Sequence, residues 1–148
     1  MLKVEMEKVF ERDIDLLMIN KFCNDQRVVE YFNSKVGLSN YNVTDAQHSI
    51  MDENGESDIT IILSNGHDKV AYLIEDKIDA IEMPNQRARY NIRGNKGVEN
   101  GYYDKYYVFI IAPKDYLNTN NEAQKYENQI SYEELTTILD IDIFSKSL

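Results

Sequence analysis

The chain has 148 residues and a formal net charge of −10. That length fits one domain, residues 1–148, built around one sizeable core. The single cysteine, Cys23, excludes a disulfide framework and a cysteine-based zinc site, and it favours a reducing compartment, for which we expect the cytoplasm. No apolar run approaches the roughly 20 residues needed to cross a membrane, so we expect no membrane partner.

The negative charge is unevenly distributed along the chain. Residues 77–96 hold five bases and two acids, which leaves a net charge of −13 on the rest. The overall acidity argues against a passive nucleic-acid coat, because Lys and Arg drive phosphate binding. An acidic body with one basic segment is nevertheless compatible with a metal-dependent phosphodiesterase.

In the first third of the chain the main feature is a long helix. Apolar residues recur at three- and four-residue spacing from about residue 8 to 32 and predict this helix. Glu11 falls in its first turns, where an acid suits the helix dipole; it is either such a charge or a ligand delivered to a metal at the sheet. Residues 33–54 are less regular, and within them residues 45–51 predict a short strand or a turn of helix. His48 stands alone there, and we assign it no role.

A β-hairpin follows and is the clearest element of the sequence. Two apolar runs, Ile59–Leu63 and Val70–Ile74, flank a turn that contains Asn65 and Gly66, a strong hairpin signal. The hairpin folds either between Gly66 and His67 or on Asn65–Gly66. These two closures differ by two residues in register, so the same side chains share a face in both.

The charged end of this hairpin is the first candidate site. In one register Asp58 lies opposite Glu75; in the other it faces Leu73, with Glu75 diagonal to it. Lys77 projects on the same side as Glu75. Like charges directly opposed in a sheet are destabilising and call for a compensating cation, and carboxylate oxygens suit Mg²⁺ or Mn²⁺. The alternative is a surface hairpin in which Lys77 merely neutralises Glu75.

A polar helix is predicted after the hairpin. Pro84 marks its start, and we expect it to end at Gly94 or Gly97. Gln86 and Tyr90 are four residues apart and therefore share a face. They belong either to a surface helix whose tyrosine packs down or to a helix beside an active site, whose arginines face nucleic acid.

The last third of the chain predicts a buried strand. Tyr106–Ala112 is a continuous apolar run, typical of a central strand with helices on both faces of the sheet. We expect a loop over residues 114–121. Around Ser131 the sequence predicts either a short strand or a helix over Tyr132–Leu139 with Ser131 as its cap, since Glu134 follows at capping-box spacing.

The hairpin and the helix after it resemble the PD-(D/E)XK nuclease superfamily. Asp58 matches the first acid of the family's motif, and Glu75 and Lys77 match its Asp/Glu-x-Lys, with Asp76 as the x residue. Ser57 stands where the full motif has Pro, a position that many members leave unfilled. This three-residue match is weak alone and gains specificity from its position on a predicted hairpin.

Other parts of the chain extend the resemblance, which covers roughly residues 7–139. Gln86 and Tyr90 are similar to the Gln-x-x-x-Tyr helix motif of several branches. The segment Glu11–Leu17 looks like the N-terminal helix of a bacterial branch in which a Glu completes the metal site. The strand Val108–Ala112 is similar to the strand that follows the motif helix.

The resemblance implies an α/β (α+β), restriction-endonuclease-like fold with a central mixed sheet flanked by helices and a core order α-β-β-β-α-β. It implies a nuclease that hydrolyses phosphodiester bonds, of DNA before RNA, with a water activated by Mg²⁺ or Mn²⁺. The implied metal ligands are Glu11, Asp58, Glu75 and the backbone carbonyl of Asp76. The implied catalytic residues are Asp58, Glu75, Lys77 and Gln86, and the implied nucleic-acid contacts are Arg87, Arg89, Tyr90, Arg93 and Lys96.

Two other functions stay open at this point. The chain is alternatively a catalytically inactive nuclease-fold module that binds nucleic acid or a partner protein; the complete acid–acid–lysine set argues against this. It is also compatible with a homodimer, or with a subunit of a larger assembly that has the site but little activity alone.

Overall fold

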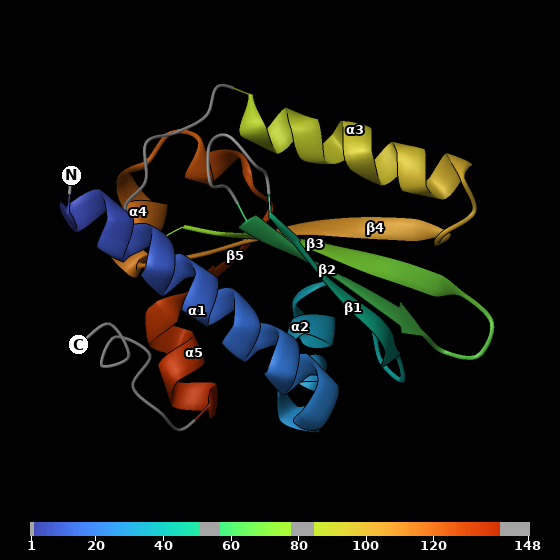
Figure 1. The fold of residues 1–148 in the computed structure, drawn as a ribbon. Coiled ribbons are helices and arrows are strands. Elements are labelled where there is room, and N and C mark those ends of the chain that lie inside the picture. Colours follow the sequence, from blue (N-terminus) through green and yellow to red (C-terminus); the bar gives the residue numbers. More distant parts are fainter. Residues whose placement is uncertain (1, 51–56, 78–84, 140–148) are drawn as a thin grey trace.

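The computed structural model describes residues 2–50, 57–77 and 85–139, with side chains described within 13–48, 58–77 and 85–139. It is an α/β arrangement in which helices cover both faces of a five-stranded mixed sheet, as predicted (Figure 1). The strands are β1 (Asn42–Ile50), β2 (Ser57–Ser64), β3 (Lys69–Asp76), β4 (Lys105–Ala112) and β5 (Asn128–Ser131). The helices are α1 (Leu2–Asn24), α2 (Gln26–Lys35), α3 (Gln86–Glu99), α4 (Lys114–Thr119), the 3-10 helix η1 (Ala123–Lys125) and α5 (Tyr132–Leu139).

The strands lie in the order β1-β2-β3-β4-β5. The pairs β1–β2 and β2–β3 are antiparallel, whereas β3–β4 and β4–β5 are parallel. A parallel pair needs a long crossover connection, which α3 provides between β3 and β4. The described elements therefore follow the predicted sequence of helix, three strands, helix and strand.

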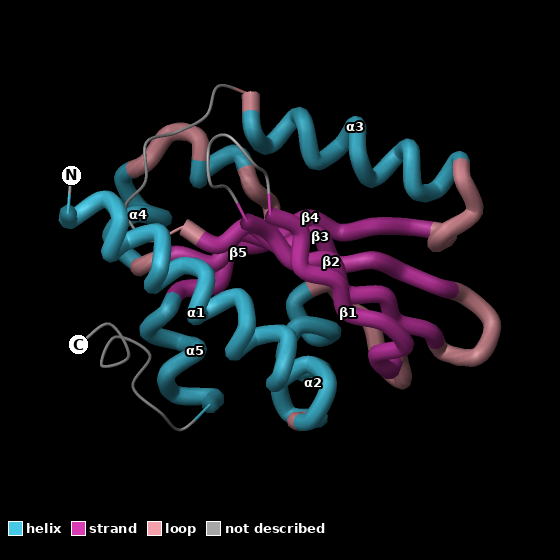
Figure 2. Tube along the Cα trace, viewed as in Figure 1, coloured by secondary structure: helices cyan, strands magenta, loops and turns pink. Residues whose placement is uncertain are grey.

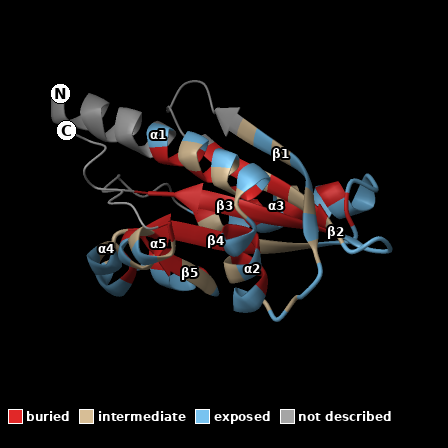
Figure 3. Cartoon of the chain, turned by 90° about the horizontal axis from the view of Figure 1, so that it is seen from below, coloured by how far each residue is buried: buried red, intermediate tan, exposed pale blue. Residues whose placement is uncertain are grey.

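Two apolar layers hold the helices to the sheet. Helices α1, α2 and α5 cover one face and α3 covers the other, as Figures 1 and 2 show. Along β3, Tyr72 and Ile74 point into the first layer, whereas Ala71 and Leu73 point into the second. Seen from below in Figure 3, β3 and β4 are buried along most of their length, whereas no described side chain of β1 is buried.

The hairpin takes the first of its two predicted registers. Asp58 lies opposite Glu75, and the pairing runs back to the turn without a shift. In the turn, the Asn65 side-chain oxygen accepts hydrogen bonds from the backbone of His67 and Asp68, at 2.9 and 2.7 Å. Gly66 has a φ of +97°, a conformation that favours glycine.

The predicted long helix is two helices. α1 ends at Asn24 and α2 begins at Gln26. Asp25 between them is in an extended conformation, and its side chain accepts a hydrogen bond of 3.0 Å from the backbone N–H of Arg27. Asp25 thus acts as an N-cap, which satisfies one of the N–H groups that a new helix leaves open.

The predicted end of the helix at Gly94 or Gly97 is wrong, because α3 continues to Glu99. Both glycines are buried inside the helix and face β4 and the loop before it. A Cβ atom at Gly94 would lie 2.5 Å from the Tyr106 ring, and one at Gly97 would overlap the end of the Tyr103 side chain. The glycines therefore permit close helix–sheet approach rather than ending the helix. Pro84, its predicted start, lies outside the described residues.

In three further segments the structure either differs from the predicted element or decides between the predicted alternatives. β1 is a full nine-residue strand where a short strand or helical turn was expected, and α4 replaces the loop expected over 114–121. Both alternatives at Ser131 occur: β5 ends there and α5 begins at the next residue. The capping box is present, since the Glu134 backbone N–H donates to Ser131 Oγ and the Ser131 N–H donates to Glu134 Oε1, at 3.0 and 2.7 Å.

Within the described ranges, none of the helices combines the length and apolar character that a membrane span requires.

Candidate functional site

Two acids meet where β2 begins and β3 ends. Asp58 and Glu75 are a directly opposed antiparallel pair, so their Cβ atoms are only about 4.5–5.5 Å apart. Their exposed fractions are 6% and 3%. Lys77, two residues after Glu75, is equally buried, and its Nζ lies 3.5 Å from Glu75 Oε2. The hairpin alone thus brings two carboxylates and one ammonium into the interior.

Helix α3 supplies one partner to each acid. The Tyr90 hydroxyl donates a 2.5 Å hydrogen bond to Glu75 Oε1. Three residues later, Arg93 Nη1 donates a 2.7 Å hydrogen bond to Asp58 Oδ2. These two residues lie on one face of α3, because residues three apart in a helix are neighbours.

The electrostatics of these partners follow from burial and from the acids. Burial, helped by the Glu75 carboxylate, raises the pKa of Tyr90 well above its usual value, so its hydroxyl keeps the proton that it donates. Burial alone would lower the pKa of Arg93, but the neighbouring Asp58 carboxylate outweighs it and raises that pKa. Arg93 is therefore a permanent cation beside Asp58.

One carboxylate oxygen fits a cation ligand. Asp58 Oδ1 is buried and has no hydrogen-bond partner among the described residues. A buried acceptor of this kind costs free energy unless something satisfies it, and a hard divalent cation takes such oxygens. Glu11 lies in α1, but its side chain is outside the described set. Among the side chains that are described, no group of three or more His, Cys, Asp or Glu could hold a metal ion.

Asp76 turns to the opposite face of the sheet. Its side chain is buried, and Oδ1 accepts a hydrogen bond from the Tyr132 hydroxyl at the start of α5. The next backbone N–H, that of Lys77, donates to the carbonyl of Ile111 on β4 at 2.9 Å. The side chain of Asp76 thus anchors the end of β3 on the face away from Asp58 and Glu75, and the role predicted for its backbone carbonyl stays a prediction.

The predicted site residues at the start of α3 mostly contact other residues of the same chain. Gln86 is the first residue of α3 and is 6% exposed. Arg87 Nη2 donates to both carboxylate oxygens of Glu127, at 3.0 and 2.7 Å, and its guanidinium lies 5.7 Å from the centre of the Tyr126 ring. Tyr90, predicted to contact nucleic acid, has its hydroxyl directed to Glu75 instead.

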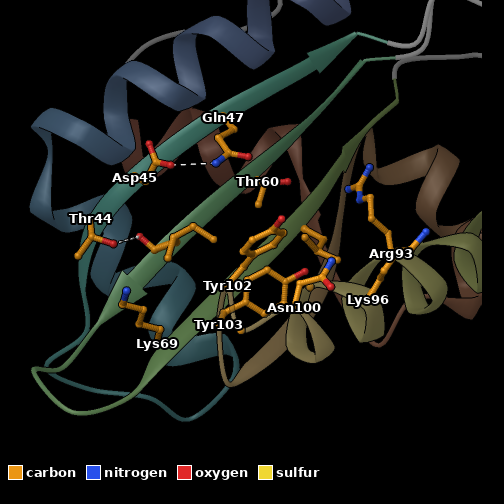
Figure 4. Close-up of a pocket in the computed structure, with 14 residues that line it drawn as sticks. Thr44, Asp45, Gln47, Thr60, Lys69, Arg93, Lys96, Asn100, Tyr102 and Tyr103 are labelled. Carbon is orange, nitrogen blue, oxygen red and sulfur yellow. Dashed lines mark hydrogen bonds between the residues drawn. The ribbon is translucent and has the colours of Figure 1, made fainter.

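The remaining predicted cations are closer to solvent. Arg89 and Lys96 are exposed on α3, and the Arg93 side chain is 41% exposed despite its bond to Asp58. Arg93 and Lys96 share a cleft of about 740 Å³, shown in Figure 4. The cleft lies between the exposed face of β1 and β2 and the C-terminal half of α3 with the loop that follows it.

Sequence reasoning missed several residues of this cleft. Lys69 lines it from the start of β3, and Tyr102 from the loop after α3. The hairpin pattern contains a signal for Lys69, because alternation puts it on the same face as Glu75. No such signal exists for Tyr102, since its position depends on where α3 ends.

A second polar pair lies on the other face of the sheet. His48 Nε2 is 3.2 Å from Asp15 Oδ2, and Asp15 is fully buried on α1. His48, to which no role was assigned, therefore links α1 to β1.

Comparison of the chain with models of protein families, with curated proteins and with solved structures finds no significant match. A function for the site consequently rests on its own chemistry. Asp58 and Glu75 are opposed acids whose oxygens suit a hard cation. The Lys77 ammonium lies beside Glu75, and the Arg93 guanidinium lies between Asp58 and the basic cleft.

Proposed function

We propose that the chain is a metal-dependent nuclease that hydrolyses phosphodiester bonds of nucleic acid, DNA before RNA. The observation that carries the proposal is the burial of Asp58, Glu75 and Lys77 together, each at most 6% exposed. Burying charged groups is costly unless they are paired or hold a metal. A hairpin that merely ended in surface charges would leave all three in water, where they cost nothing.

The fold supports the same proposal. Three antiparallel strands, a covering helix and a strand parallel to β3 are compatible with a restriction-endonuclease-like arrangement. In it the two acids lie on neighbouring strands and the helix motif lies above them. The three buried residues, Asp58, Glu75 and Lys77, are also the residues that resemble the PD-(D/E)XK motif.

Asp58 and Glu75 would hold Mg²⁺ or Mn²⁺, with Asp58 Oδ1 as the available oxygen. The backbone carbonyl of Asp76 and the Glu11 side chain are the further ligands that the resemblance implies. When bound, such an ion polarises the phosphoryl oxygen and lowers the pKa of a coordinated water.

The chain's own side chains would act around that water and the phosphate. As an ammonium, Lys77 would orient the attacking water or neutralise the charge that develops on the phosphate; as the neutral amine, it would accept the proton of that water. Its Nζ lies 3.5 Å from Glu75 Oε2. Gln86 would orient the same water or the phosphate. Tyr90 holds Glu75 in one orientation through its hydrogen bond. Arg93 would bind a backbone phosphate without reading sequence.

The test is cleavage of plasmid, single-stranded DNA and RNA by the purified protein with Mg²⁺, with Mn²⁺ and with EDTA. We expect metal-dependent cleavage that Glu75→Ala and Lys77→Ala abolish while circular dichroism shows a folded domain. Lys114→Ala, which alters an exposed lysine on α4, is the matched control and should retain full activity. Undiminished cleavage by both Glu75→Ala and Lys77→Ala would contradict the proposal.

A second candidate is the inactive module. It is favoured by one observation, namely that Arg93, Lys77 and Tyr90 already give each acid a partner without any metal. Metal titration separates the two. An enzyme should gain thermal stability as Mn²⁺ binds its folded form, whereas an inactive module should show no change in melting temperature.

A further inference from the structure

We propose that the cleft beside α3 binds a single-stranded segment of nucleic acid and leads it to the Asp58–Glu75 pair. The inference rests on the proposed function, because it names the form of substrate that the site receives. The binding step stands on the cleft itself and can be measured without cleavage.

The lining of the cleft is basic, whereas the chain as a whole is acidic. Lys69, Arg93 and Lys96 line it, against a single acid, Asp45. The whole chain, in contrast, has 16 bases and 26 acids. The two Asp45 oxygens accept hydrogen bonds from the Gln47 side chain and the Ala46 backbone, both at 2.9 Å. This local excess of positive charge suits a phosphate backbone.

Arg93 connects the cleft to the buried acids. Arg93 lines the cleft and donates its hydrogen bond to Asp58. Its other terminal nitrogen, Nη2, is buried and has no hydrogen-bond partner among the described residues, whereas the side chain as a whole is 41% exposed. Lys69 stands at the far end, six residues before Glu75 on β3. At about 3.3 Å per residue the two are roughly 20 Å apart, a span of no more than about six nucleotides of a stacked strand.

An exposed aromatic ring distinguishes a single strand from a duplex. The Tyr102 side chain is 65% exposed at the cleft, beside Asn100 and Lys96 (Figure 4). Proteins that bind single strands combine a cationic groove with aromatic side chains on which bases stack. A paired base is stacked inside its duplex and cannot reach such a ring. A volume of about 740 Å³ is also that of a small-molecule site, which admits a few splayed nucleotides.

The experiment measures binding by fluorescence anisotropy in EDTA, so that nothing is cleaved. The probes are labelled oligo(dT) and oligo(U) of about 12 nucleotides, twice the estimated length of the cleft, and a duplex of equal length. We expect either single strand to bind at least about tenfold more tightly than the duplex. The DNA and RNA arms identify which sugar the cleft prefers.

Variants assign the binding to named side chains. Tyr102→Ala should weaken single-strand binding by about 5- to 100-fold, whereas Tyr102→Phe keeps the ring and should bind as the wild type does. Lys69→Ala should reduce the slope of log affinity against log salt by about 0.7, the value of one phosphate contact. Lys114→Ala removes an exposed lysine outside the cleft and should leave that slope unchanged.

Failure of this inference is distinguishable from failure of the proposed function. Duplex binding as tight as single-strand binding, or a Tyr102→Ala variant that binds normally, overturns the inference even if the enzyme cleaves. Tyr102-dependent binding by a protein that cleaves no substrate with Mg²⁺ or Mn²⁺ supports the inference and overturns the proposed function. Glu75→Ala should lose cleavage and retain single-strand binding.

Discussion

The hydroxyl of Tyr90 donates a 2.5 Å hydrogen bond to Oε1 of Glu75 and so ties helix α3 to the acidic end of β3. Both side chains are buried, at 5% and 3% exposed. The other Glu75 oxygen lies 3.5 Å from the Lys77 ammonium. The acid is therefore held from two sides, by a neutral donor of one element and a cation of its own strand.

Replacing Tyr90 by Phe removes this bond and leaves the ring. We expect the affinity for Mn²⁺ to fall by about 10-fold or more, because groups that orient a metal ligand contribute that much to binding. The free energy of unfolding should fall by about 1–3 kcal/mol, because a buried carboxylate oxygen loses its donor. Electron paramagnetic resonance titration with Mn²⁺ and urea unfolding measure the two effects.

Tyr126→Phe is the matched control for Tyr90→Phe. The two rings are in edge contact, with centroids 6.3 Å apart, but the buried Tyr126 hydroxyl has no hydrogen-bond partner among the described residues. Its removal should leave Mn²⁺ affinity unchanged and stability equal or slightly higher. Equal Mn²⁺ affinity in both variants would contradict a role for Tyr90 in holding Glu75.

If Asp58 is a metal ligand as proposed, Arg93 and the metal ion would compete for its carboxylate. Arg93→Gln should lower the free energy of unfolding of the metal-free protein by about 1 kcal/mol, a modest value because the arginine is 41% exposed. With the guanidinium gone, Asp58 is left without its cation, so Mn²⁺ should raise the melting temperature more than in the wild type. Thermal unfolding with and without Mn²⁺ gives both numbers. Lys96→Gln, an exposed cation on the same helix, should show the wild-type increment, and an unchanged increment in Arg93→Gln would refute the competition.

Gly94→Ala reverses the usual effect of this substitution. In an exposed helix interior, alanine is about 1 kcal/mol more favourable than glycine. At Gly94 the new methyl group would lie 2.5 Å from the Tyr106 ring, so we expect a loss of about 1–3 kcal/mol from overpacking. Urea unfolding measures it, and the exposed Ala88→Gly in the same helix should lose about 1 kcal/mol from propensity alone. A stabilised Gly94→Ala would show that α3 does not depend on this close approach.

Glu134 gives stability a specific dependence on pH. Burial alone would raise its pKa, but hydrogen bonds from Tyr31, the Ser131 backbone and Lys35 outweigh burial and lower the pKa below 4.5. Because the folded pKa is depressed, the stabilisation is complete above the unfolded value and is lost as pH falls through the folded one. The free energy of unfolding of the wild type should therefore exceed that of Glu134→Gln by at most about 1 kcal/mol at about pH 7, and this difference should narrow as the pH is lowered below the unfolded value of about 4.3. Urea unfolding at neutral and acidic pH checks this, and a difference that widens in acid would contradict the sign.

The parts of the fold that the sequence predicted are those set by neighbours in the chain. That Asp58 and Glu75 share one face follows from strict alternation, because a one-residue slip would expose the apolar face. The choice between the two registers, which differ by two residues, came only from the structure. The burial of Val108–Ala112 follows from an unbroken apolar run, although Tyr106 and Tyr107 at its start are only partly buried. The capping box at Ser131 likewise depends on two residues three apart.

The parts that were missed depend on contacts between distant segments. Gly94 and Gly97 resemble helix-ending glycines until Tyr106 and Tyr103 are packed against them. β1 is a polar edge strand whose pairing with β2 contains a shift after Val43, so its alternation is broken. The bonds that α3 sends to the two acids, and the cleft beside them, cross between layers and leave no periodic signal in the sequence.

The hairpin determines which residues of the site could be moved together to another protein. The two acids and Lys77 come from one continuous segment, whereas the groups that restrain them come from α3 and, through Asp76 and Tyr132, from α5. A graft of residues 58–77 onto another sheet would thus carry the charges without their restraints. We expect such a transplant to be tolerated as a strand pair and to bind metal poorly. The segment that can be moved thus contains the charged groups, whereas the groups that restrain them remain in α3 and α5.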